Sequence, residues 1–278
     1  MSKITKIIHT GDIHIMNLRR QEEYVEQFNK FFSMVDEMIA ADGDADSFRI
    51  VVCGDIFHNK LDISGEAYTI AHWFLSELGK RCKTIVICGN HDVNMANLSR
   101  IDPITTLFNM SNLDNVIYLD KELNYESGCL SDENVIWCLF SSFDNFNRPN
   151  IEEISIEHPD KALIGLFHGE VKGSKTDAGF QSENGLNADH FSGLDCCLCG
   201  HIHKRQILNA KGTKVIYSGS MIQKDHGENI SGHGFGVWNV EDKTYEKYDI
   251  ENTDYGFYTF SITDEEDIDN DKEKLLNL

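Results

Sequence analysis

The 278-residue chain carries 25 Lys and Arg against 46 Asp and Glu, which gives a formal net charge of −21 at pH 7. Its length suits one large α/β domain or two small ones, and its 41% hydrophobic content is ordinary for a globular protein. No apolar run reaches the roughly 18 residues of a membrane helix, and the first residues lack a signal-peptide pattern. We therefore expect a cytoplasmic protein without membrane association, or a nuclear or viral-factory protein if the source is eukaryotic or viral. The acidity excludes attraction of DNA by overall charge.

Strands and helices alternate along the first third of the chain. Apolar runs predict the strands, spacings of three and four predict the helices, and Ser64 is a plausible N-cap. In order, the segments are strand 6–10, helix 25–39, strand 48–53, helix 64–78 and strand 83–88. This order is typical of a mostly parallel α/β sheet with right-handed crossovers.

The rest of the chain is rich in predicted strands. We expect them at 115–119, 134–140, 162–168, 195–201, 213–220, 235–240 and 255–262. The predicted fold class is α/β, and the predicted domain is residues 1–262. Residues 263–278 form a predicted flexible, acidic tail.

Polar side chains follow five of the apolar strands. Because ligands of open α/β sheets bind outside the carboxyl ends of the strands, these clusters can converge in space. In an extended segment, residues two apart also face the same way. The clusters are Asp12 with His14, Asp55 with His58, Asn90 with His91 and Asp92, His168 alone, and His201 with His203.

The chemistry of these side chains favours divalent metal ions. Oxygen and imidazole donors suit manganese, iron or zinc, whereas a sulfur set would indicate structural zinc. A shared aspartate can bridge two ions about 3.5–4 Å apart, which is the arrangement used for in-line phosphoryl displacement. The net charge of such a site is about +1 when two divalent ions are combined with two carboxylates and a bridging hydroxide. That positive charge would attract a phosphate.

The eight cysteines fit a reducing compartment, since most lie in apolar runs. Three of them precede His201 in the segment CCLCGHIH, which resembles a compact zinc site. No second cysteine pair follows at zinc-ribbon spacing. We therefore expect Cys196, Cys197 and Cys199 to be packing residues of a strand that leads to the histidines.

The motifs GDIH, GDIFH, GNHD, FHG and GHIH occur in this order. They resemble the five motifs of the calcineurin-like metallophosphoesterases and span about residues 8–203. The histidine of GDIFH and the segment YSGSMIQ (217–223) are similar to the SbcD/Mre-eleven DNA-repair nucleases. The Asp-Arg-Gly that protein phosphatases carry after their second motif is missing.

The resemblance implies a metallophosphoesterase fold, in which two packed mixed β-sheets are flanked by helices, with a dinuclear metal site at the carboxyl ends of the strands. It also implies two divalent ions, Mn²⁺ first, with Mg²⁺, Fe²⁺ or Zn²⁺ as alternatives. His91 would stabilise or protonate the leaving oxygen, and His58 would orient the scissile phosphate. Asp92 either orients His91 or caps a helix. The implied metal ligands are Asp12, His14 and His203 for the first ion, Asp55 as the bridge, and Asn90, His168 and His201 for the second.

The function implied is a manganese-dependent DNA exo- or endonuclease in repair, recombination or DNA processing, with a metal-bridging hydroxide as nucleophile. Implied partners are DNA, a coiled-coil ATPase of SbcC type and a second copy of the chain. Candidate contacts are the helices 67–78 and 97–110 for the second copy, and Leu275, Leu276 and Leu278 for the ATPase. The family's DNA-capping domain is expected to be absent or much reduced.

Two other functions stay open. A small-molecule phosphodiesterase or phosphatase on the same scaffold is favoured by the acidity of the chain. A binding subunit with a vestigial metal site is disfavoured by the complete ligand set.

Overall fold

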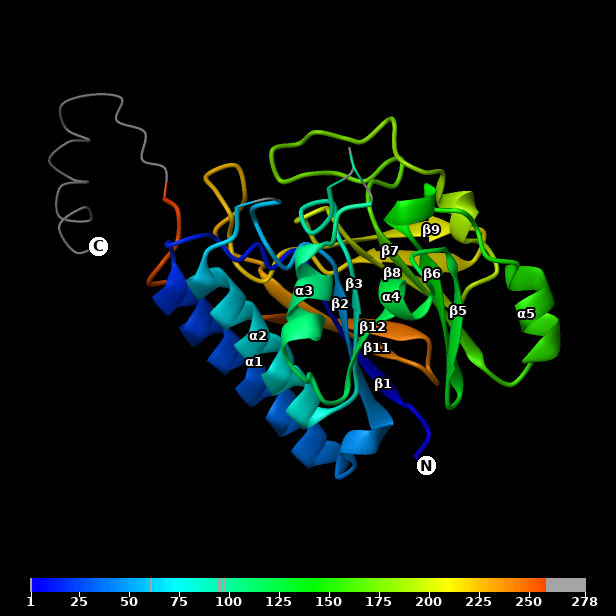
Figure 1. Ribbon diagram of the computed structural model, residues 1–278. Coiled ribbons are helices and arrows are strands. Elements are labelled where there is room, and N and C mark those ends of the chain that lie inside the picture. The colour runs from blue at the N-terminus through cyan, green and yellow to red at the C-terminus, as the bar shows by residue number, and fades with distance from the viewer. Residues whose placement is uncertain (1, 61, 95–96, 98, 259–278) are drawn as a thin grey trace, which may run out of the picture.

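Two six-stranded β-sheets form the centre of the computed structural model, which describes residues 2–60, 62–94, 97 and 99–258 (Figure 1). The first sheet has the order β12-β11-β1-β2-β3-β4 and the second β5-β6-β7-β8-β10-β9. The first comprises β1 (Lys6–Thr10), β2 (Phe48–Cys53), β3 (Thr84–Ile87), β4 (Val116–Tyr118), β11 (Gly234–Asn239) and β12 (Thr244–Asp249). The second comprises β5 (Gly128–Asp132), β6 (Val135–Phe140), β7 (Ala162–His168), β8 (Cys196–Gly200), β9 (Gln206–Ala210) and β10 (Thr213–Tyr217).

Helices flank this pair of sheets. In Figure 1, α1, α2 and α3 lie beside the first sheet, and α5 lies on the side of the second. The predicted fold class, two packed mixed sheets flanked by helices, is confirmed. The helices are α1 (Gln21–Asp42), α2 (Gly65–Arg81), α3 (Pro103–Met110), α4 (Leu119–Glu122) and α5 (Ile151–Glu157), with short 3₁₀ turns at Ala45–Ser47, Ser142–Asp144 and Ala188–Phe191. None of the helices in the described residues is long and apolar enough to span a bilayer.

Each sheet combines four parallel strands with two strands that are added in antiparallel fashion. Strands β1 to β4 run parallel in the first sheet, as do β6, β7, β8 and β10 in the second. Strands β11 and β12 extend one sheet in antiparallel fashion, and β5 and β9 do so in the other. The carboxyl ends of the parallel strands therefore gather in two rows, one from each sheet.

Strand β2 is buried on both faces, which explains why its sequence FRIVVC is apolar apart from Arg49, and Arg49 is paired with Asp132. Ile50 and Val52 belong to the core under α1 and α2, while Val51 belongs to the core between the sheets. Burial on both sides fixes β2 in the middle of the molecule. The polar residues that follow it are consequently held between the two sheets.

The two sheets are in direct contact where β2 and β8 end. A side chain at Gly200 would place its Cβ 1.9 Å from the carbonyl oxygen of Cys53, so only glycine fits there. The Cys53 thiol also donates to the Leu198 carbonyl at 3.4 Å. This contact brings the loops after β2 and β8 together.

The predicted strands and helices of the first third are all present, and Ser64 caps α2 by accepting the Ala67 N–H at 3.2 Å. The predicted strand 255–262 is wrong for residues 255–258, which form no strand, and its remainder lies outside the described residues. The predicted tail 263–278, with Leu275, Leu276 and Leu278, also lies outside them. Strands β5, β9 and β12 were not predicted, because they lie near or at sheet edges and are partly exposed, so their sequences lack an apolar run.

Candidate metal centre

Left-handed backbone marks the loops that carry the predicted ligands. Asp12, His14, Asp55 and His201 have φ values of 52°, 50°, 53° and 95°. Such values are uncommon for residues other than glycine and cluster at functional sites, where the surrounding structure holds the strain. Here the backbone N–H of Asp12 donates to the backbone carbonyl of Gly54 at 3.0 Å. The backbone N–H of His14 donates to the backbone carbonyl of Asp55 at 2.9 Å. The loops after β1 and β2 are thus tied together by their backbones.

The predicted ligands of the first metal lie together. One ligand atom from each of Asp12, His14 and His203 falls within 4.8 Å of the others. Nε2 of His14 is 3.0 Å from Nε2 of His203. The Asp12 carboxylate also accepts the His201 N–H, at 2.8 and 3.0 Å, which connects this group to the next.

The predicted ligands of the second metal form a neighbouring group. Ligand atoms of Asp55, His168 and His201 lie within 4.8 Å of one another. Oδ1 of Asn90 is 3.1 Å from Nε2 of His168 and 2.7 Å from Nδ1 of His201. The structure thus brings all seven predicted ligands into one place.

Asp55 lies between the two groups, as a bridging ligand must. Its Oδ2 is 3.5 Å from Nε2 of His14 and 3.4 Å from Nε2 of His168. Its Oδ1 accepts the backbone N–H of His91 at 2.7 Å. Burial opposes ionisation of Asp55, but the facing His168, His14 and His91 hold the pKa of its carboxyl well below the usual range. The carboxylate is therefore ionised and available to cations.

The donor arrangement around His168 fits a bound cation. The Cys53 carbonyl faces Nδ1 of His168 at 2.8 Å, so this nitrogen donates. In the neutral ring Nε2 then carries a lone pair, yet it faces the oxygens of Asn90 and Asp55. Burial opposes protonation, but the charge and hydrogen bond of Asp55 raise the pKa of His168 to about 10. The surroundings of His168 thus stabilise positive charge at Nε2, and a bound divalent ion would supply that charge.

His203 is oriented by a carboxylate that the sequence did not reveal. Its Nδ1 donates to Oε1 of Glu228 at 2.5 Å, which leaves Nε2 for a metal. Metal-binding histidines commonly donate their second ring nitrogen in this way. Glu228 also accepts the Lys224 N–H at 2.8 Å and the Ser220 hydroxyl at 3.4 Å. No motif marked it, because it lies in the Gly-rich loop 225–234, 25 residues beyond His203.

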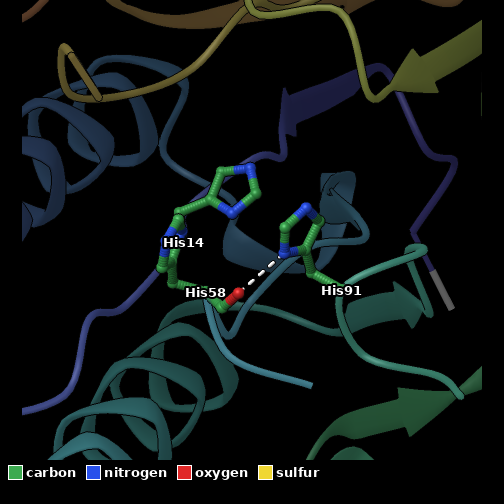
Figure 2. A group of neighbouring side chains, drawn as sticks. All are labelled: His14, His58 and His91. Carbon is green, nitrogen blue, oxygen red and sulfur yellow. Dashed lines mark hydrogen bonds between the residues drawn. The ribbon is translucent and has the colours of Figure 1, made fainter.

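A third group lies beside these ligands and contains both predicted catalytic histidines. Ligand atoms of His14, His58 and His91 fall within 4.8 Å of one another (Figure 2). The rings of His58 and His91 are stacked at an angle of 24°, with centroids 5.7 Å apart. Nδ1 of His91 donates to the His58 carbonyl at 2.6 Å, the dashed line in Figure 2. Nε2 of His91 is therefore the nitrogen left for substrate.

Among the residues that the structure describes, the Asp92 carboxylate contacts neither the His91 ring nor the start of a helix. This buried carboxylate accepts the N–H groups of Ile56, Phe57 and Gly89, at 3.0 to 3.2 Å. It therefore fastens the loop that carries Asp55 to the loop that carries Asn90. Burial, with the nearby Asp55 charge, raises the pKa of Asp92 to about 7.

The cysteines before His201 are packing residues, as predicted. Cys196, Cys197 and Cys199 are fully buried free thiols of β8. Cys197 and Cys199 share one face, with their sulfurs 3.7 Å apart, and Cys196 packs between the sheets.

The profile of the calcineurin-like phosphoesterase family matches residues 5–205, and the chain belongs to this family. Membership of this family implies metal-dependent hydrolysis of phosphoesters, and the Asp and His groups of the chain are candidate sites for the two divalent metals typical of the family. An uncharacterized protein of Acanthamoeba polyphaga mimivirus is 34% identical over 271 residues, which are 95% of this chain. The chain spans only 19% of that viral protein.

A more distant similarity links the chain to a solved structure. The phosphopantetheinyl hydrolase of Mycobacterium tuberculosis aligns with a TM-score of 0.43 and 14% identity. The alignment covers 78% of this chain and 89% of that one.

Glu228→Gln should weaken metal binding without unfolding the protein. The amide keeps a hydrogen-bond acceptor for His203 but removes the negative charge, and loss of such a partner typically costs about 10–100-fold in metal affinity. Calorimetric titration of the metal-free protein with Mn²⁺ measures the change. Glu246→Gln on the exposed edge strand β12 is the matched control. Equal Mn²⁺ affinity in both variants would show that Glu228 does not support a metal ligand.

Proposed function

We propose that the protein is a manganese-dependent DNA nuclease of SbcD/Mre-eleven type, acting in DNA repair, recombination or DNA processing. The observation that carries the proposal is His58, which lies against His91 and His14 at the edge of the ligand groups. A histidine at this point of the second motif is a feature that the chain shares with these nucleases, and we expect His58 to contact the scissile phosphate. Bound divalent ions would supply an activated water and neutralise phosphate charge.

His91 is the proposed proton donor to the leaving oxygen. Its backbone N–H is held by Asp55 and its Nδ1 by the His58 carbonyl, so both the loop and the ring are fixed. Only Nε2 is left to carry a proton to substrate. A positioned acid matters most when the leaving group is an alkoxide, as in DNA.

The YSGS segment supports the same site from the second sheet. The Tyr217 hydroxyl donates to the Gly169 carbonyl at 2.8 Å and accepts the Val171 N–H at 2.9 Å, which fixes the loop after His168. Gly219 has a φ of 73°, and a Cβ there would lie 2.6 Å from the His203 carbonyl oxygen. The segment that resembles the nuclease subgroup thus contacts the loop that follows His168 and the loop that carries His203.

The nuclease proposal is tested against the alternative of a small-molecule phosphodiesterase. Purified protein with Mn²⁺ is assayed on linear duplex DNA, single-stranded DNA and bis-p-nitrophenyl phosphate. We expect cleavage of DNA as well as of the small diester. Asp55→Asn, which alters the shared ligand, is the inactive control. Hydrolysis of the small diester with both DNAs intact would favour the alternative.

His91→Ala should keep the metal ions and lose turnover selectively. Loss of a proton donor typically costs about 10²–10⁴-fold in rate. Because p-nitrophenolate leaves without a proton, the loss should be large on DNA and small on bis-p-nitrophenyl phosphate. Metal analysis and kcat on both substrates measure the effect. An equal loss on both substrates would contradict the role.

We also propose that DNA binding depends on a partner, either a second copy of the chain or a coiled-coil ATPase of SbcC type. With a net charge of −21 and a screening length of about 8 Å in 0.15 M salt, the field of the bound ions reaches only the nearest phosphates. A partner would add contact surface and effective concentration. Asp55→Asn protein alone should bind a 30-base-pair duplex weakly in a titration at that salt. Nanomolar binding by a monomer would refute the dependence.

A further inference from the structure

A cleft of about 370 Å³ lies beside the candidate metal centre. The loop after β7 forms one wall and the loop after β10 forms the other. Two predicted metal ligands form the end nearest the metal centre. The residues that define it are His201 and His203 at this end, Thr176 and Asp177 on one wall, and Lys224 and Glu228 on the other.

The cleft has three acidic side chains, Asp177, Asp225 and Glu228, and each of them accepts hydrogen bonds from the protein; Asp225 accepts the Gly227 N–H at 2.7 Å. Asp177 accepts the backbone and side-chain N–H groups of Asn229, at 3.3 and 3.0 Å, and pairs with the Lys204 ammonium at 3.4 Å. Glu228 accepts from His203 and from the Lys224 backbone. The Asp177 carboxylate thereby balances the positive charge of Lys204.

Lys224 differs from Lys204 in this respect. In the part of the chain that the structure describes, its ammonium pairs with no carboxylate. Lys224 lines the same cleft as the predicted metal ligands His201 and His203. An unbalanced cation at the mouth of an acidic protein's active site is a place for an anion.

The backbone of Lys224 is held in position by Arg20. The guanidinium of Arg20 donates to the carbonyls of Gln223 at 2.7 Å and Lys224 at 3.4 Å, and it is itself paired with Glu23. It also lies 4.8 Å from the ring centroid of Phe257. The backbone from which the Lys224 side chain extends is therefore fixed, which reduces the entropy lost when the ammonium binds an anion.

We propose that Lys224 binds the phosphate next to the scissile phosphate, and that the cleft holds the intervening nucleotide. The inference rests on the proposed nuclease function. The metal centre accounts for one phosphate, and the cleft extends from His201 and His203 toward a second cationic site. A small diester offers one phosphate to these two cationic sites, whereas an oligonucleotide offers several, so Lys224 would favour an oligonucleotide.

The test compares Lys224→Gln with the wild type on a fluorescent single-stranded oligodeoxythymidylate. Ca²⁺ replaces Mn²⁺, and anisotropy gives the binding constant at several low salt concentrations. Loss of one phosphate contact should weaken binding and reduce the slope of log K against log salt by about 0.7. Lys224→Arg should restore the slope. Lys211→Gln, in the exposed turn between β9 and β10 and paired with Asp189, is the matched control.

Kinetics in Mn²⁺ provide the second measurement. Lys224→Gln should lose about tenfold or more in kcat/KM on the oligonucleotide, the equivalent of about 1.4 kcal/mol, and lose much less on bis-p-nitrophenyl phosphate. An unchanged salt slope, an equal loss on both substrates, or failure of the wild type to bind the oligonucleotide would overturn the inference. If the wild-type protein binds the oligonucleotide without cutting it, the nuclease function alone is refuted. The salt slope of Lys224→Gln would still show whether Lys224 contacts a phosphate.

Discussion

The Asp55 carboxylate is the contact on which the site depends, because it joins residues from both sheets. It follows β2 in the first sheet, its Oδ2 lies 3.4 Å from His168 at the end of β7 in the second, and its Oδ1 holds the His91 backbone. Asp92 fastens the same loop by accepting two of its N–H groups. Hydrogen bonds to Oδ1 of Asp55 and to the backbone of its loop thus hold the arrangement in place.

The close approach of the sheets makes this contact feasible. A Cβ at Gly200 would lie 1.9 Å from the Cys53 carbonyl oxygen, and one at Gly54 would lie 2.5 Å from Nδ1 of His168. Glycine at these two points lets the strand ends reach contact distance. The apolar core between the sheets provides the force that keeps them there, and the glycines set the spacing.

The sequence was sufficient to predict the strands that end at polar clusters, because a fully buried strand must be apolar and its polar continuation stands out. The same contrast marked the five clusters that contain the seven side chains brought together by the structure, and the resemblance to the metallophosphoesterases selected these seven as ligands. The contrast could not identify Glu228, Lys224 or Arg20. Arg20 and Lys224 are 204 residues apart, and they meet through a carbonyl group that leaves no trace in the side-chain pattern. Edge strand β12 was missed because most of its side chains are exposed, so it has no apolar period.

The division of the ligands between two sheets also has a thermodynamic consequence. A cation held by Asp55 together with His168 would fasten one sheet to the other, and no unfolded chain offers the same set of donors. A ligand that binds only the folded state, at 100 times its Kd, adds about 2.7 kcal/mol to stability. That amount is a large part of the roughly 5–15 kcal/mol that holds an ordinary domain together. The abundance of the folded protein in a cell would then follow the supply of divalent metal, so that scarcity of the ion lowers the amount of enzyme as well as its rate.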